Sequence, residues 1–353
     1  MSKNFIIALI LMLTWTFSFS LGNLLIVVFI LKEQNWKIEA NRITVILILI
    51  SILSLINILI GFNSEKLLND GSSSLQLIIP YLSLLLGAYV IGNYINTQVI
   101  KYLIYFTAIE CIVILIQYLA GETGFWYNSY EKNEIHGELL YYSRPNGFST
   151  NSSVVAQKLL ISIWCLIRSK FISWKDNKVI FCILLIGLIL TFNRTVFLAL
   201  GVSYFLVSGG LKLKYKIAAF LALILLLIVF INPIKKQFNR GSDDVNIESL
   251  TRYSVYYNGI NFIADNLLFG NHSIKYFYEE NDRKFHLHNS YLQTAASNGL
   301  PIFLLVMYIV LILKKRKNLF IVPILIYSFL QFGILWGIGF LDIVLFFNKN
   351  KKL

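Results

Sequence analysis

Residues 43–62 read ITVILILISILSLINILIGF, a run of twenty residues without one charged side chain. A helix of about 20 apolar residues is long enough to cross the hydrocarbon core of a bilayer. The run is apolar throughout and does not alternate with polar residues, which favours a helix over a barrel strand. We therefore expect a membrane-spanning helix at this position.

The rest of the chain has the same character. Of its 353 residues, 57% are hydrophobic and 14% are charged, and the mean hydropathy is +0.68. One soluble core of this length would not bury so much apolar surface. Within the hydrocarbon every spanning segment must also satisfy its own backbone hydrogen bonds. The sequence therefore predicts an all-α, polytopic integral membrane protein and excludes a soluble enzyme.

About ten apolar runs are candidate transmembrane helices of a single membrane domain over residues 1–353. They are residues 5–31, 43–62, 75–95, 102–120, 152–167, 179–192, 195–207, 217–231, 291–313 and 319–347. The first run is too long for the apolar part of a signal peptide, so we interpret it as the first membrane helix. Its polar stretch from Thr14 to Asn23 leaves open whether it is one simple crossing, and the length of the last run raises the same question.

Basic residues gather in the segments 168–178, 211–216 and 314–317. Cytoplasmic loops are enriched in lysine and arginine, so we expect all three segments in the cytoplasm. Two long loops, 121–150 and 233–289, are then extracytoplasmic. Counting crossings back from them puts residues 32–42 in the cytoplasm and the N-terminus outside. This topology signal accounts for the net charge of +13, and no nucleic-acid partner is expected.

The second long loop has a helix of its own. Apolar residues recur at helical spacing, which predicts an amphipathic helix near residues 249–267: Leu250, Tyr253, Tyr257, Ile260, Ala264 and Leu267. We expect this helix to lie on the membrane surface or on the outer ends of the bundle. Arg252, Tyr256 and Gly259 fall on its other face, which would point toward water or a ligand.

All four histidines of the chain lie in the two long loops: His136, His272, His286 and His288. Asn289 or Ser290 can cap a helix that follows His288, and Gly299 with the proline after it would interrupt that helix. The dipole at a helix N-terminus disfavours an imidazolium, so His288 would stay neutral and able to accept a proton. The alternative is that His288 only precedes a helix and faces solvent.

Two charged residues stand within or between apolar runs. Arg194 lies in the turn between two runs, where a lone cation is costly unless it is paired or faces a polar cavity. Glu110 lies inside the run 102–120, where a hydrogen-bonded buried partner is favoured over a proton or cation site. Outer-face arginines can also bind lipid headgroups without taking part in catalysis.

Four stretches, in this order, resemble the O-antigen polymerase and ligase superfamily of bacterial envelope glycosyltransferases. They are RPNGFSTNSSVVA from Arg144, TFNRTVFLAL around Arg194, the helix with Arg252 that runs into NLLFGN, and HNSYLQTAASNGLPIF from His288. The chain departs from the family pattern at Thr150–Ser153, where family members usually carry asparagine and proline after the loop arginine.

The resemblance implies that a glycan is transferred from an undecaprenyl diphosphate carrier to an acceptor hydroxyl. The reaction would take place at the outer face of the bacterial cytoplasmic (inner) membrane. On the matching positions, Arg144, Arg194 and Arg252 would hold the diphosphate, and His288 would deprotonate the acceptor. Guanidinium groups suit this task because they stabilise phosphate charge through bidentate hydrogen bonds.

Asn289 and Tyr256, beside the expected base and on the expected face of the loop helix, would bind substrate. No metal or cofactor is expected, because the loop acids form adjacent pairs and no compact cluster. The partners would be the lipid-linked oligosaccharide, membrane lipid and a regulator of chain length. We predict a polymerase of O-antigen or capsule repeat units, with a ligase that moves the glycan to lipid A-core as the alternative. A flippase is less favoured, because transporters place ionisable residues at the midplane and show repeated halves.

Overall fold

The computed structural model describes residues 2–16, 20–61, 80–120, 134–135, 138–139, 145–149, 152–191, 193–207, 245–280, 283–315, 318–331, 333–335 and 337–347. Its helices are α1 Lys3–Thr16, α2 Ser20–Glu33, α3 Arg42–Gly61, the 3-10 helix η1 Tyr81–Leu84, α6 Leu85–Tyr94, α7 Thr97–Ala120, α8 Ser152–Arg168, α9 Lys178–Leu190, α10 Arg194–Val207, α13 Val245–Asp265, α14 Ser290–Lys315, α15 Ile321–Leu330 and α16 Phe340–Leu345. The strands of the described residues are β1 Glu134–Ile135, β2 Glu138–Leu139, β3 Phe277–Glu280 and β4 Arg283–His286, which pair in antiparallel hairpins.

The described part of the chain is mostly helical, as predicted. Three of its helices, α3, α7 and α14, are long and apolar enough to cross a membrane. Further apolar helices, among them α1, α9, α10 and α15, are shorter. The expected run 217–231 lies outside the described residues, so about ten crossings stays a prediction from apolar runs of bilayer length.

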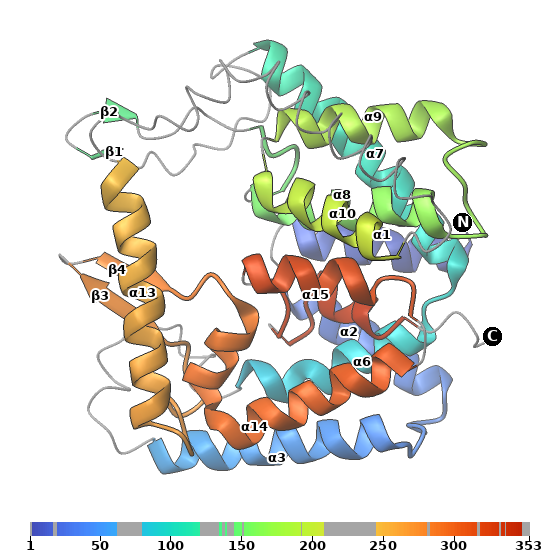
Figure 1. Cartoon of the computed structure of the whole chain (residues 1–353). Helices are drawn as coiled ribbons and strands as arrows, with labels where there is room; N and C mark the ends of the chain where they lie inside the picture. The colour runs from blue at the N-terminus through green and yellow to red at the C-terminus, as the bar shows by residue number, and fades with distance from the viewer. Residues whose placement is uncertain are drawn as a thin grey trace.

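The bundle helices run side by side, and α13 lies across one end of them (Figure 1). We call this end, where α3 ends and α14 begins, the loop end. The opposite end, where α1 and α3 begin and α14 ends, is the basic end. Helix ends and turns there carry most of the described cations: Lys3, Lys32, Lys37, Arg42, Lys101, Arg168, Lys170, Lys175, Lys178, Lys314 and Lys315.

The first apolar run forms two helices instead of one. α1 and α2 pack against each other, and Lys3 at the start of α1 forms an ion pair with Glu33 at the end of α2. The N-terminus therefore lies at the same end as residues 33–42, and the prediction that it lies on the opposite side is wrong. The polar stretch explains the turn: Asn23 accepts a hydrogen bond from the Thr14 hydroxyl (2.7 Å) and donates one to the carbonyl of Ile338 (2.8 Å).

The last apolar run also turns back. α15 ends at Leu330 and α16 begins at Phe340. The amide of Asn318, just before α15, donates a hydrogen bond to the carbonyl of Leu345 at the end of α16 (2.7 Å). The two ends of this run thus meet at the basic end, which resolves the ambiguity left by its length.

Helix α14 is interrupted at Gly299, as predicted, where the backbone has φ 80° and ψ 168°. A Cβ at this position would lie 2.2 Å from the carbonyl oxygen of Leu268, so glycine allows the loop before the hairpin to approach. The loop bonds directly to the opened helix: Leu300 donates to Leu267 (2.7 Å) and Ser273 donates to Ser297 (2.7 Å). The break therefore joins the second long loop to the bundle.

Candidate functional site

The site begins with the cap of α14. The side-chain oxygen of Asn289 accepts hydrogen bonds from the backbone N–H groups of Tyr291 (2.9 Å) and Leu292 (3.0 Å), which confirms the predicted cap. The amide nitrogen of Asn289 donates to the carbonyl of Phe329 at the end of α15 (3.0 Å). Because the side chain is 5% exposed and both ends are engaged, this geometry suits positioning of α14 better than direct contact with substrate.

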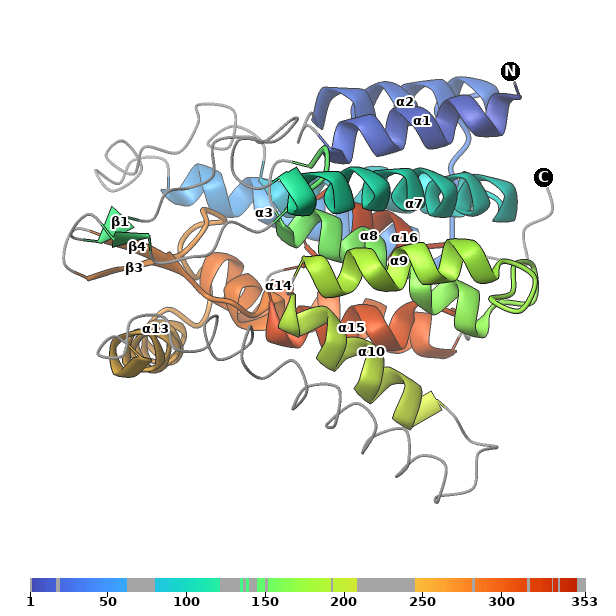
Figure 2. The same ribbon diagram turned by 90° about the horizontal axis from the view of Figure 1, so that it is seen from above.

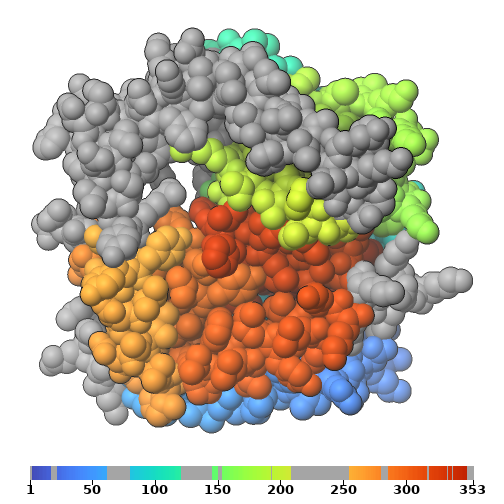
Figure 3. Space-filling model, in the orientation of Figure 1, coloured from blue at the N-terminus to red at the C-terminus, as the bar shows by residue number. Residues whose placement is uncertain are grey.

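His288 directly precedes this cap, and its backbone is held from a second side. The hydroxyl of Tyr256 in α13 donates a hydrogen bond to the carbonyl of His288 (3.1 Å). Beneath this contact Val255, Tyr276 and Leu287 form a small apolar cluster with Ala296 of α14. Figure 3 shows α13 and α14 as one continuous surface in shades of orange. His288 therefore stands where three parts of the chain meet.

The packing of α13 corrects one expectation about its faces. The face with Tyr256 and Gly259, predicted to point toward water or a ligand, is turned to the hairpin and α14. The opposite apolar row is exposed, with Tyr257 at 56% and Ile260 at 53%. Position 252 falls on the inward face by helical periodicity, but the side chain of Arg252 lies outside the described residues.

A second histidine accompanies His288. The rings of His286, in β4, and His288 have their centroids 4.5 Å apart. Burial, the positive charge of Lys275 and the neighbouring His288 together lower the pKa of His286 to about 3, so its imidazole is uncharged at neutral pH. Burial also lowers the pKa of Lys275, to about 8. The sequence pattern predicts no role for His286, although two residues that are two apart in an extended segment share a face.

A small pocket opens beside Lys275. It is lined by Lys275, Gln293 and Ser297 among others and has a volume of about 20 Å³, enough for one water molecule. The side chain of Gln293 accepts a hydrogen bond from the N–H of Leu287 (3.0 Å) and donates one to the carbonyl of Tyr276 (3.0 Å). Gln293 therefore ties the residue before β3 and the residue after β4 to the first turn of α14.

Arg194 is the first residue of α10 and is exposed. Asn193 caps this helix, because its side-chain oxygen accepts a hydrogen bond from the N–H of Val196 (3.1 Å). α10 packs against α15, and its first turn lies toward α13 and the β3–β4 hairpin (Figure 2). The structure thus brings the start of α10, the start of α14 and α13 to the loop end of the bundle.

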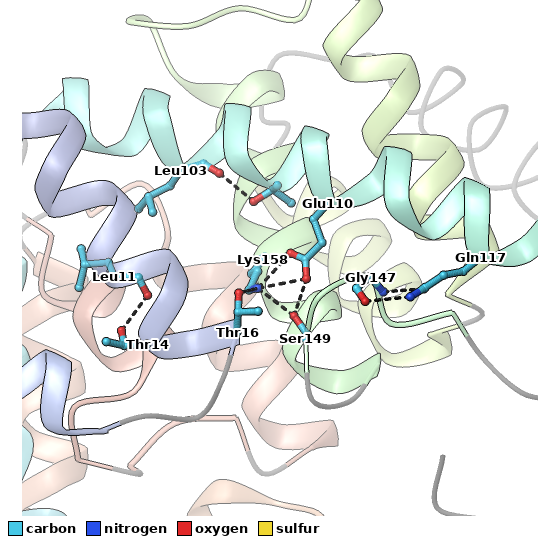
Figure 4. Close-up of polar contacts among 10 residues, drawn as sticks. Leu11, Thr14, Thr16, Leu103, Glu110, Gln117, Gly147, Ser149 and Lys158 are labelled. Carbon is cyan, nitrogen blue, oxygen red and sulfur yellow. Dashed lines mark hydrogen bonds and ion pairs between the residues drawn. The ribbon is translucent and has the colours of Figure 1, made fainter. Parts of the chain in front are cut away.

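The first long loop contributes a different set of contacts. Arg144 lies outside the described residues, but residues 145–149 directly after it are described and lie inside the bundle. Glu110 accepts hydrogen bonds there from Lys158 and from Ser149, which confirms the predicted buried partner (Figure 4). Lys158 was not expected to be this partner, although a lone lysine within an apolar run indicates a buried polar contact.

Comparison with known proteins bears on the second half of the chain. A family model described as O-antigen ligase matches residues 179–307. This range contains Arg194, Arg252 and His288 and leaves Arg144 outside. No curated protein matches the chain significantly. The resemblance to the O-antigen polymerase and ligase superfamily is therefore confirmed for residues 179–307.

Proposed function

We propose that the protein is a membrane glycosyltransferase that joins lipid-linked saccharide repeat units into O-antigen or capsule polysaccharide. One observation carries the proposal: within the matched range, the Tyr256 hydroxyl of α13 holds the backbone of His288 directly before α14, at the end of the bundle where α10 also begins. A bare scaffold for lipid packing would not need two imidazole rings side by side there. A flippase finds no support in the comparison, because the matching family model is described as O-antigen ligase.

The charge distribution supports an orientation for this site. The basic end holds eleven described cations (Lys3, Lys32, Lys37, Arg42, Lys101, Arg168, Lys170, Lys175, Lys178, Lys314 and Lys315) against the acids Glu33, Glu39 and Asp176. Lysine and arginine are enriched on the cytoplasmic side of membrane proteins. The loop end then faces outward from the bacterial cytoplasmic membrane, where a lipid-linked glycan and its acceptor can meet.

The proposed reaction forms one bond and breaks one. The acceptor hydroxyl attacks the anomeric carbon of the donor glycan, a new glycosidic C–O bond forms, and the C–O bond to the diphosphate breaks. His288 takes the proton of the acceptor hydroxyl. The carrier leaves as a diphosphate anion, which the guanidinium groups of Arg194, Arg252 and Arg144 stabilise. Undecaprenyl diphosphate is the proposed carrier.

A ligase is the second candidate, since the matching family is described as O-antigen ligase. It would transfer the finished glycan to lipid A-core with the same donor chemistry. The two differ in the product that accumulates without the protein: a single repeat unit on lipid A-core without the polymerase, and long chains on the lipid carrier without the ligase.

The experiment deletes the gene, restores it on a plasmid, and separates the envelope polysaccharide on a gel. We expect the deletion to leave single repeat units and the wild-type gene to restore long chains. His288→Ala should stay in the membrane and fail to restore them. The matched control is His272→Ala, because His272 is another histidine of the second loop and stacks on the ring of Phe269. Normal chain length with His288→Ala would remove this residue from the proposed chemistry.

A further inference from the structure

Residues 145–149 are held inside the helix bundle by side chains from two helices, α7 and α8. The side-chain amide of Gln117, in α7, forms two hydrogen bonds with the backbone of Gly147: it donates to the carbonyl (2.9 Å) and accepts from the N–H (2.9 Å). Figure 4 shows this pair beside Ser149, which contacts Glu110 and Lys158. The loop backbone is thus fixed at two points by α7 and α8.

The second point of attachment is a buried ionic network. Lys158, in α8, donates hydrogen bonds to the carboxylate of Glu110 (3.0 Å), to the hydroxyl of Ser149 (2.8 Å) and to the hydroxyl of Thr16 (3.0 Å). The Ser149 hydroxyl donates to Glu110 (2.5 Å). The side chains of Glu110 and Lys158 are each 1% exposed. All three donor positions of the ammonium group are therefore used.

Such a pair calls for an explanation other than stability. Removing two charges from water costs several kcal/mol per ion, and well-packed apolar residues in their place are often equally stable. A network in which every donor of the ammonium group is used instead holds its residues in one arrangement. The turn that it holds is itself specific: Gly147 has φ +62°, and a Cβ there would lie 2.5 Å from Cγ of Glu110.

The geometry points to a positioning role, and we propose that Glu110, Gln117 and Lys158 form a clamp that fixes residues 145–149 and, through them, the main chain of Arg144. Pro145 follows Arg144 directly and is buried. A residue before proline is restricted to extended conformations, so an anchored Pro145 narrows the positions open to Arg144. The consequence for diphosphate binding rests on the proposed function, whereas the holding of residues 145–149 does not.

The test uses the full-length protein purified in detergent or nanodiscs. Gln117→Ala removes both bonds to Gly147 and keeps every charge. The double variant Glu110→Gln with Lys158→Met removes both charges together, so that neither is left buried alone. Thr107→Val is the matched control, because its hydroxyl is buried in the same helix and bonds only within it, to Leu103 (2.8 Å).

We expect Gln117→Ala to lower kcat/KM for the lipid-linked donor about ten- to hundredfold, mainly through KM, because a small misplacement of a binding group has costs of this size. Thr107→Val should match wild type. Combining Gln117→Ala with Arg144→Ala should cost little more than Arg144→Ala alone, since the clamp acts through that residue. If the fold-losses in kcat/KM of the two single variants multiply in the double variant, the clamp does not act through Arg144.

Hydrogen–deuterium exchange separates the clamp from the reaction. Backbone amides of residues 146–149 should exchange faster in Gln117→Ala and in the double variant, with α7 itself unchanged, and they should be unaffected in Thr107→Val. Unchanged exchange in both clamp variants would overturn the clamp. Faster exchange in a protein that transfers no glycan even as wild type would leave the clamp standing and remove the proposed function.

Discussion

The imidazole of His286 is partly buried, and both burial and the positive charge of Lys275 oppose its protonation. Its pKa is therefore about 3 in the folded protein, against about 6.5 in an unfolded chain. Between these values the unfolded chain binds more protons. Proton binding by the unfolded chain therefore lowers the free energy of unfolding as the pH falls from about 6.5 toward 3. Above about pH 6.5 His286 is neutral in both states, and this loss is absent.

The direction of this pH dependence of stability gives a prediction for a single residue. The midpoint of thermal unfolding of the purified wild-type protein should fall as the pH is lowered from 7.5 to 5, and it should fall less in His286→Gln, which has no imidazole to protonate. The measurement is intrinsic fluorescence during heating in detergent at both pH values. His272→Gln serves as the control, and its unfolding midpoint should fall between pH 7.5 and 5 by as much as that of wild type. An equal fall of the unfolding midpoint in all three proteins would contradict the lowered pKa of His286.

At the scale of elements, α13 joins the site to the surface. Its inner face packs on the hairpin and α14 through Val255 and Tyr256. Tyr257 and Ile260 on its other face, and Leu267 just after its end, are exposed apolar residues. The helix lies across the end of the bundle and not along it (Figure 1). An apolar row on a helix in this position suits the interface between the lipid chains and the headgroups.

We predict that Ile260 contacts lipid. A spin label at Ile260→Cys, in protein with Cys182 replaced by serine, should be relaxed more by oxygen, which concentrates in the bilayer, than by a water-soluble nickel complex. A label at Asp265→Cys, on an exposed polar position of the same helix, is the control and should show the reverse. Equal access of the nickel complex to both labels would place α13 away from the membrane.

At the scale of the whole molecule, the first and the last apolar run each turn back on themselves, and these two turns decide at which end of the bundle the described ends of the chain lie. The ion pair between Lys3 and Glu33 and the bond between Asn318 and Leu345 bring the described N-terminal and C-terminal parts to the basic end. Glu279, in β3, belongs to the opposite, loop end. The bundle is therefore polarised, with cations at one end and the candidate site at the other.

Labelling with a membrane-impermeant maleimide tests this polarity. In protein without Cys182, a cysteine at Lys37 should react in inverted vesicles and stay unreactive in intact spheroplasts, and a cysteine at Glu279 should show the opposite pattern. Cys111 and Cys165 are buried and set the background. Reaction of both positions from the same side would contradict the arrangement of the two ends.

The local features of the site were accessible from the sequence. The cap at Asn289, the break at Gly299 and a buried partner for Glu110 all follow from the chemistry of one residue type in its immediate surroundings. A side-chain acceptor next to free N–H groups, a glycine before a proline and a carboxylate in hydrocarbon have few stable solutions. These predictions therefore needed no knowledge of distant segments.

The sequence by itself determined the membrane class, the largely helical structure and the residues that end and begin the helices at the site. Tertiary structure alone decided that the first run folds into a hairpin, that α13 turns Tyr256 inward, that Lys158 is the partner of Glu110 and that His286 stands beside His288. The physical reason is that apolar runs in lipid carry no marked inner face. Which side packs, and against what, depends on hydrogen bonds between residues far apart in the chain.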